Sequence, residues 1–141
     1  MALTHLDPRS AANAMQKEKN IEFIDVRTVE EFNQGHPRGT KNIPIFKMDP
    51  RTGQKIPNLE FKKVVEKNIP KEKTIFLICG SGQRSMMAGM QMETFGFEKL
   101  VNIKGGFWGS ESTSGWKEQD LPVCEKDCDC TSYQTLEKNP S

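Results

Sequence analysis

The chain has 141 residues, and its 20 basic and 19 acidic side chains leave a formal net charge of +1. This length favours a single domain, and the near-neutral charge argues against a nucleic-acid-binding protein, which needs an excess of Lys and Arg. Hydrophobic residues make up 35% of the chain and charged residues 28%, which is typical of a globular protein. No apolar run approaches the roughly 20 residues that cross a bilayer, and no signal peptide is recognisable. We therefore expect a cytoplasmic protein that does not bind membranes.

Helices and strands are predicted to alternate along the chain. Pro8 at a first helical position and the capping box of Thr28 and Glu31 mark two helix starts, and the continuous apolar run at 74–78 is typical of a central parallel strand. The expected elements are, in chain order, a helix at 8–19, a strand at 21–26, a helix at 28–35, a strand at 42–45, a loop at 47–57, a helix at 58–67, a strand at 74–78, a helix at 84–95, a strand at 99–103 and a short helix at 107–116. This pattern predicts an α/β fold with a small, mostly parallel central sheet and helices on both faces.

The most informative segment runs from Ile78 to Met86 and reads ICGSGQRSM. The buried strand delivers Cys79 to its carboxyl end, where open α/β sheets bind ligands, and a glycine-containing loop then leads into a helix. Inward-turned N–H groups and the helix start would form an anion cradle that favours the thiolate. Arg84 adds a permanent cation suited to an oxyanion. A buried, inert cysteine is the alternative, which the glycines and the arginine make less favoured.

Three groups of residues occur in an order that matches a known family. They are Asp25-Val26-Arg27 with Glu30-Glu31-Phe32, Gly35-His36, Gly39 and Asn42-Ile43-Pro44, then Cys79-Gly80-Ser81-Gly82-Gln83-Arg84-Ser85, and finally Gly105-Gly106-Phe107. Together they resemble the amino-terminal signature, the active-site loop and the closing glycine pair of a rhodanese domain, over residues from about 4 to 123. One departure is that Pro37 and Arg38 stand where the family usually has an apolar residue and a proline. The shape of that loop therefore stays open, and Arg38 adds a cation there.

The resemblance implies a sulfurtransferase. Rhodaneses move a sulfane sulfur from thiosulfate or a persulfide onto a cysteine, and cyanide or a thiol then accepts it. Cys79 would be the catalytic nucleophile. The residues that would bind the anionic substrate are Gly80, Ser81, Gly82, Gln83, Arg84 and Ser85. The scheme needs no metal and no organic cofactor, and we expect a monomer whose partners are a small-molecule sulfur donor and a thiol acceptor, either small or carried by a protein.

Two other functions, and another subclass of sulfurtransferase, are alternatives at this point. Rhodanese-fold phosphatases resemble this sequence but have one more residue in the loop, whereas Cys79 to Arg84 inclusive is six residues, which suits sulfur better than phosphate. A non-catalytic rhodanese module that binds partners or senses oxidants through Cys79 is the main alternative. Mercaptopyruvate sulfurtransferases share Cys-Gly-Ser-Gly, but their loop continues without this arginine and they normally carry two domains. The run Gln83-Arg84-Ser85 looks more like the small single-domain enzymes.

The chain is expected to divide into a rhodanese domain at 1–123 and a polar, flexible tail at 124–141. The tail holds Cys124, Cys128 and Cys130, and this crowding is unlike a secreted disulfide scaffold. Three thiols are one short of a closed zinc site, and their acidic neighbours disfavour thiolates. The tail cysteines could be incidental, relay a persulfide from Cys79, bind a soft metal ion or serve a redox role.

A few other residues carry expectations that the structure can test. Asp25 and Arg27 are expected to hold neighbouring turns, and His36 to stabilise a loop. Phe107 and Trp108 could wall the site. The methionines expected mostly to pack in the core or a pocket are Met86, Met87, Met90 and Met92.

Overall fold

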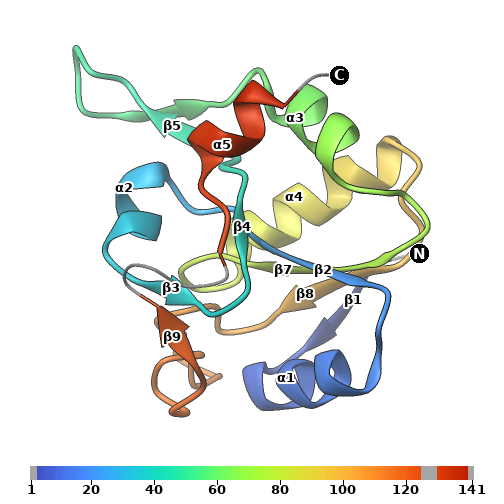
Figure 1. Ribbon diagram of the computed structural model, residues 1–141. Coiled ribbons are helices and arrows are strands. Elements are labelled where there is room, and N and C mark those ends of the chain that lie inside the picture. Colours follow the sequence, from blue (N-terminus) through green and yellow to red (C-terminus); the bar gives the residue numbers. More distant parts are fainter. Residues whose placement is uncertain (1–2, 125–129, 140–141) are drawn as a thin grey trace.

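A five-stranded parallel sheet forms the centre of the protein (Figure 1). The computed structural model describes residues 3–124 and 130–139. The strands are, in order across the sheet, β1 (Leu3–Leu6), β8 (Leu100–Ile103), β7 (Thr74–Ile78), β2 (Ile21–Asp25) and β4 (Lys41–Asn42). Every neighbouring pair is parallel, so the carboxyl ends of all the strands lie along one edge of the sheet. The predicted α/β fold with a mostly parallel central sheet is confirmed.

Two short antiparallel pairs lie outside the central sheet. The strand β3 (His36–Pro37) pairs with β9 (Val123–Cys124), and β5 (Phe46–Met48) pairs with β6 (Lys55–Pro57). The expected loop at 47–57 is therefore a hairpin whose turn uses Gly53 at φ +72. The expected strand at 42–45 is shorter and lies at 41–42, although the N–H groups of Ile43 and Ile45 still donate to the carbonyls of Asp25 and Val26.

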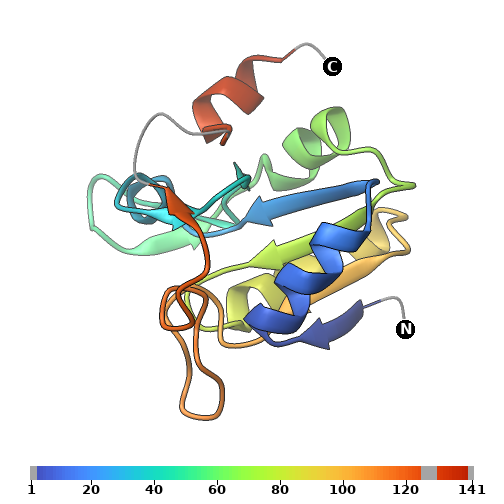
Figure 2. The same ribbon diagram turned by 60° about the horizontal axis from the view of Figure 1, so that its bottom comes forward.

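Helices cover both faces of the sheet. They are α1 (Pro8–Lys17), α2 (Val29–Asn33), α3 (Phe61–Asn68), α4 (Gln83–Thr94) and α5 (Tyr133–Lys138). Figure 2 shows α1 on one face and α3 on the other.

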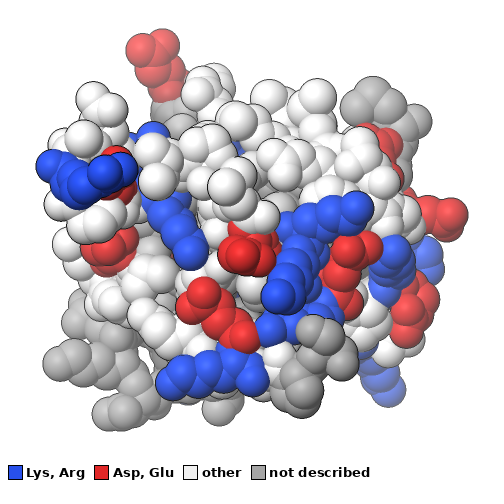
Figure 3. Space-filling model, turned by 90° about the horizontal axis from the view of Figure 1, so that it is seen from above, with Lys and Arg blue, Asp and Glu red and all other residues white. Residues whose placement is uncertain are grey.

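On the face of the molecule seen in Figure 3, basic and acidic side chains are intermixed. Among the described residues no helix is long and apolar enough to cross a membrane. The cytoplasmic location stays a prediction.

The core has two halves because strand residues point alternately to the two faces. In β7, Phe76 and Ile78 pack in the cluster under α1, which also contains Phe107 and Trp116. The cluster on the other face holds Ile75, Leu77 and Cys79 from the same chain segment. Cys79 therefore faces the side of the sheet on which α4 lies.

The helix expected at 107–116 is not present, and this segment consists of turns. Gly105, Gly106 and Gly109 all have positive φ, between +57 and +105. Such left-handed positions interrupt a right-handed helix, so the glycines around Phe107 produce a compact loop instead.

The described part of the expected tail packs against the domain. Tyr133 and Leu136 of α5 are each 3% exposed and belong to the core cluster on the α4 face. Asn58 Nδ2 donates to the Tyr133 hydroxyl at 3.1 Å, and Asn68 Nδ2 donates to the Leu136 carbonyl at 3.1 Å. The overlooked signal is an apolar pair spaced i, i+3 behind the N-cap Ser132, which together specify a short amphipathic helix.

Candidate active site

Cys79 directly follows the carboxyl end of β7, the central strand of the sheet. The strand β7 has β8 on one side and β2 on the other, so the loops that follow all these strands meet around this cysteine. Only a short loop separates it from α4, and Gly82 ends that loop at φ +108 as the residue before the helix. A side chain at Gly82 would be strained at this φ, and its Cβ would approach Gly105 N to 3.3 Å. The local sequence thus forces the abrupt strand-to-helix turn that the motif predicted.

Two hydrogen-bond donors point at the sulfur. The Gly82 N–H donates to Cys79 Sγ at 3.1 Å, and the Ser85 hydroxyl lies 3.3 Å from the same atom. Cys79 is a free thiol and is only 1% exposed. Hydrogen bonds from such donors are stronger where water is excluded. Of the residues expected to form the cradle, these two contact the sulfur directly, whereas Ser81 and Gln83 are exposed.

The segment that follows Gly105 and Gly106 packs against the loop after Cys79 and holds its backbone through hydrogen bonds. Phe107 N–H donates to the Cys79 carbonyl at 2.7 Å, and Trp108 N–H donates to the Gly80 carbonyl at 2.9 Å. A Cβ on Gly106 would lie 2.5 Å from the Cys79 carbonyl oxygen and 2.6 Å from Gly80 C. Only glycine permits this approach of two backbone segments, and the approach fixes the carbonyls so that the loop N–H groups remain available.

A hydrogen-bonded chain leads from the sulfur to β1, and the sequence analysis missed it. Ser85 Oγ lies 2.5 Å from Asn102 Oδ1, and Asn102 Nδ2 lies 3.1 Å from Nδ1 of His5. Ser85 and Asn102 are both buried. The single Ser85 proton is therefore shared among several acceptors, including Cys79 Sγ and Asn102. The available signal was a buried asparagine within the otherwise apolar strand β8.

Arg84 does not have a free guanidinium. Its Nη1 lies 2.6 Å from Glu31 Oε1, and its Nη2 lies 3.0 Å from Glu31 Oε2. Burial acts to raise the pKa of Glu31, but hydrogen bonds and charge from Arg84 outweigh burial and lower this pKa to about 2. Hydrogen bonding to Glu31 in turn raises the pKa of Arg84. Glu31 also completes the capping box of α2 with Thr28, as predicted. That one carboxylate both caps α2 and pairs with Arg84 could not be predicted from the motifs.

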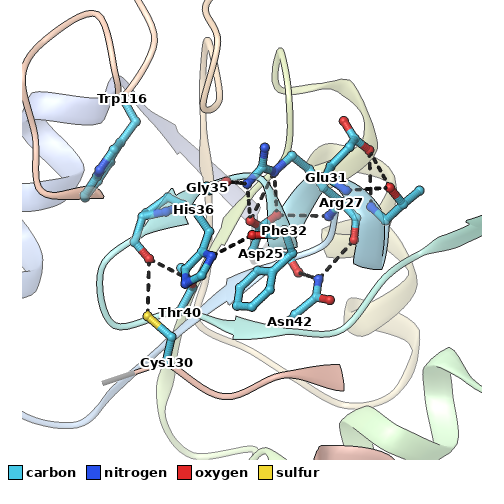
Figure 4. A network of polar contacts seen from close by, with 12 residues as sticks. Asp25, Arg27, Glu31, Phe32, Gly35, His36, Thr40, Asn42, Trp116 and Cys130 are labelled. Carbon is cyan, nitrogen blue, oxygen red and sulfur yellow. Dashed lines mark hydrogen bonds and ion pairs between the residues drawn. The ribbon is translucent and has the colours of Figure 1, made fainter. Parts of the chain in front are cut away.

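Asp25 and Arg27 form a second ion pair next to the site (Figure 4). Both side chains are fully buried, and Arg27 also donates to the Gly35 carbonyl at 2.7 Å. Its guanidinium carbon lies 4.4 Å from the centre of the Phe107 ring. His36 Nδ1 contacts the Phe32 carbonyl at 2.7 Å. These contacts hold the loops after β2 in place, which agrees with the structural roles expected for Asp25, Arg27 and His36.

The departure at Pro37 and Arg38 lies in β3 and the turn after it. Pro37 pairs with Val123 of β9, and Arg38 N–H donates to the Pro122 carbonyl at 3.0 Å. Cys130 contacts this segment, since its Sγ accepts from Gly39 N–H at 3.3 Å.

Cys124 lies in β9, and Cys128 falls outside the described residues. Within the described ranges no three His, Cys, Asp or Glu side chains are grouped to hold a metal ion.

The methionines of α4 are mostly on the surface, contrary to expectation. Met86, Met87 and Met90 are 38%, 42% and 52% exposed, and only Met92 is buried. Small residues at Ala88 and Gly89 form the packed face instead. A Cβ on Gly89 would lie 2.8 Å from Leu3 Cδ1, so α4 sits too close to the sheet for a larger side chain at this position.

The fold and the site together define a class: parallel α/β domains that carry a cysteine in a short loop between a central strand and a helix. The Rhodanese-like domain family matches residues 8–112, and the chain belongs to this family.

Named relatives and solved structures agree with this assignment. The chain is 36% identical over 104 residues to Rhodanese-like domain-containing protein 15, chloroplastic, of Arabidopsis thaliana, which is 73% of this chain and 52% of that protein. The chain thus spans about half the length of this curated relative. Thiosulfate sulfurtransferase 16, chloroplastic, of the same plant is 33% identical over 101 residues, 72% of this chain and 78% of that protein. The crystal structure of Rv0390 from M. tuberculosis has a TM-score of 0.74 at 22% identity and covers 86% of this chain and 97% of that one, which shows the shared fold.

Proposed function

We propose that the protein is a sulfurtransferase that carries a sulfane sulfur on Cys79. The observation that carries this proposal is the pair of hydrogen bonds from Gly82 N–H and the Ser85 hydroxyl to the sulfur of a free cysteine. The same donors suit the terminal sulfur of a persulfide, which is an anion of similar size. Relatives support the proposal, because one similar protein is named thiosulfate sulfurtransferase 16.

Two displacements at sulfur make up the proposed reaction. The Cys79 thiolate attacks the sulfane sulfur of the donor and forms a new S–S bond, while the donor's own bond to that sulfur breaks and the leaving group departs with the electron pair (sulfite, if the donor is thiosulfate). A thiolate or cyanide acceptor then attacks the terminal sulfur, and Cys79 leaves as a thiolate. Neither displacement needs a net oxidant, and the scheme uses no metal or organic cofactor.

Access to the sulfur requires side chains to move, since Cys79 is 1% exposed. Gly80 lies between Arg84 and Trp108, because a Cβ on Gly80 would lie 3.0 Å from Arg84 Nη2 and 3.5 Å from Trp108 Cδ1. Trp108 is 49% exposed and the Arg84 side chain is 18% exposed. Displacement of one of these surface side chains is the proposed route for donor and acceptor.

The test is to load the protein with thiosulfate and with a persulfide donor, and then to measure the mass of the peptide that contains Cys79. A gain of one sulfur atom on Cys79, with thiocyanate formed when cyanide is added, is the expected result. Cys79→Ser should abolish both signals. Cys130→Ser is the control, because Cys130 lies outside the loop of Cys79 and is only partly buried, and it should leave both signals in place. Equal thiocyanate formation by Cys79→Ser and the unaltered protein would contradict the proposal.

A non-catalytic rhodanese module is the second candidate, and the burial of Cys79 is the observation in its favour. No sulfur gain at Cys79 with either donor, in protein that is folded, would support it. A phosphatase is less favoured because the loop from Cys79 to Arg84 has six residues. Hydrolysis of an aryl phosphate that depends on Cys79 and exceeds sulfur transfer would replace the proposal.

A further inference from the structure

We propose that Glu31 selects sulfur donors by charge, so that Cys79 accepts donors with one negative charge in preference to dianions such as thiosulfate. Singly charged donors of this kind are organic thiosulfonates and the persulfides of thiols with uncharged tails. The inference rests on the proposed function and names the substrate class of the same site. It makes Glu31 a specificity-determining residue.

The ion pair with Glu31 occupies the donors of Arg84 that face it. Nη1 and Nη2 each donate to a different oxygen of the same carboxylate, at 2.6 and 3.0 Å. This two-point geometry is the one in which a guanidinium would otherwise bind a sulfonate or phosphate. The pKa of Glu31 is lowered to about 2, so the carboxylate remains charged over the whole working range of pH. An incoming dianion must therefore compete with a fixed negative charge for the same cation.

Two other cations near the strand ends interact with acidic side chains of their own. Arg27 is paired with Asp25 in a fully buried ion pair, so these two charges also cancel. Lys104, at the end of β8, interacts with Asp7. The groups that contact the sulfur itself are neutral donors, Gly82 N–H and the Ser85 hydroxyl. Neutral donors stabilise the single charge of a thiolate or persulfide without drawing further anions from solution.

Glu31 can lose its charge without losing its place in the fold. It is the third residue of α2, where its side chain accepts from Thr28 N–H at 3.2 Å while its own N–H donates to Thr28 Oγ1 at 3.2 Å. Glutamine serves equally well at this position of a capping box. Glu31→Gln therefore removes the charge next to Arg84 and keeps the start of α2. Glu30→Gln is a matched control, because Glu30 is exposed on the same turn and the change in net charge is the same.

The first experiment compares thiosulfate with methanethiosulfonate, in which a methyl group replaces one charged oxygen. Attack on the sulfane sulfur releases sulfite from one donor and methanesulfinate from the other, so the bond that breaks is the same. We expect Glu31→Gln to raise kcat/KM for thiosulfate about tenfold and to change that for methanethiosulfonate less than about threefold. Glu30→Gln should change neither. Equal changes with both donors, a loss with both, or the same shift in Glu30→Gln would overturn the inference.

The second experiment does not depend on sulfur transfer. The rate of alkylation of Cys79 is measured with iodoacetate and with iodoacetamide, which differ in charge, and is read from the peptide that contains Cys79. We expect the ratio of the iodoacetate rate to the iodoacetamide rate to rise about tenfold in Glu31→Gln and to stay constant in Glu30→Gln. An unchanged ratio in Glu31→Gln refutes charge selection. If no donor loads Cys79 but the ratio still rises, the proposed function fails while the charge selection by Glu31 stands.

Discussion

The packing of α5 against the core predicts that a substitution in this helix destabilises the whole domain. The sequence alone predicts a flexible tail, in which the same substitution would have no effect on stability. Leu136 is 3% exposed within the core cluster, and the helix that carries it is held to α3 by the hydrogen bond from Asn68. Replacing a buried leucine by alanine costs about 2–5 kcal/mol of unfolding free energy. The short terminal helix α5 can partly collapse into the space left, so we expect Leu136→Ala to cost about 2–3 kcal/mol. That is a large share of the roughly 5–15 kcal/mol that stabilises a domain.

Urea unfolding followed by circular dichroism measures this loss. With a slope of about 1–3 kcal/mol per molar urea, the midpoint should fall by roughly 1–2 M while the slope stays the same. Gln134→Ala is the control, since Gln134 is exposed on the same helix, and its effect should stay within about 0.5 kcal/mol. If the two variants unfold at the same urea concentration, α5 is not part of the core and the flexible tail expected from the sequence is correct.

Three further predictions concern the site. Gly106→Ala should lower the free energy of unfolding by more than about 3 kcal/mol and abolish sulfur transfer, because the new Cβ would overlap the Cys79 carbonyl. Gly53→Ala is the control, since Gly53 also has positive φ but has open space around it, and it should cost about 1 kcal/mol. Similar unfolding midpoints for the two variants would refute the overlap. Ser85→Ala should slow alkylation of Cys79 by iodoacetamide about tenfold, since the thiolate loses a charge-assisted hydrogen bond, and an unchanged rate would show that the hydroxyl does not stabilise it. The pKa of Glu31 is lowered from 4.5 to about 2, so its contribution to stability is present above pH 4.5 and is lost as the pH falls towards 2. The difference in thermal midpoint between the unaltered protein and Glu31→Gln should therefore shrink over that range, and a difference that stays constant would contradict the coupling.

The position of the nucleophile could be predicted because every signal for it is local. The apolar run of β7, the cysteine directly after it and the glycines before α4 lie within a dozen consecutive residues, and the backbone geometry of the loop follows from them. The hydrogen bond from Gly82 N–H to the sulfur is likewise a contact between residues three apart. The conformation of this segment therefore depends on residues within it, which is why it could be predicted from the sequence.

The partner of Arg84 could not be predicted, because it comes from a different part of the chain. Glu31 is 53 residues away in sequence and is brought to Arg84 only when β2 and β7 pair. Its role in the capping box already accounted for its presence, so nothing in the sequence required a second role. Asn102 is another distant contribution, since it reaches Ser85 through the pairing of β7 with β8.

The secondary structure that was missed is short or lies at the edges. The strand β1 pairs with β8 alone, and its Thr4 and His5 are exposed, so LTHL carries no clear apolar pattern. In the hairpin of β5 and β6, three residues on each side leave no periodicity to read. The segment at 107–116 has apolar residues only at Phe107, Trp108 and Trp116, which form no helical repeat, and the positive φ of Gly109 and of the preceding Gly105 and Gly106 is a property of backbone conformation.

Burial and reactivity at Cys79 are compatible because of the kind of donors that surround it. A sulfur that is 1% exposed has little water to stabilise its charge, so the charge depends on Gly82 N–H and the Ser85 hydroxyl. Hydrogen bonds of this kind are stronger where water is excluded. Had the stabilising group been a free arginine, the same site would also retain any small oxyanion. Because Glu31 neutralises Arg84, the donors around Cys79 can stabilise one charge on sulfur without attracting a second anion.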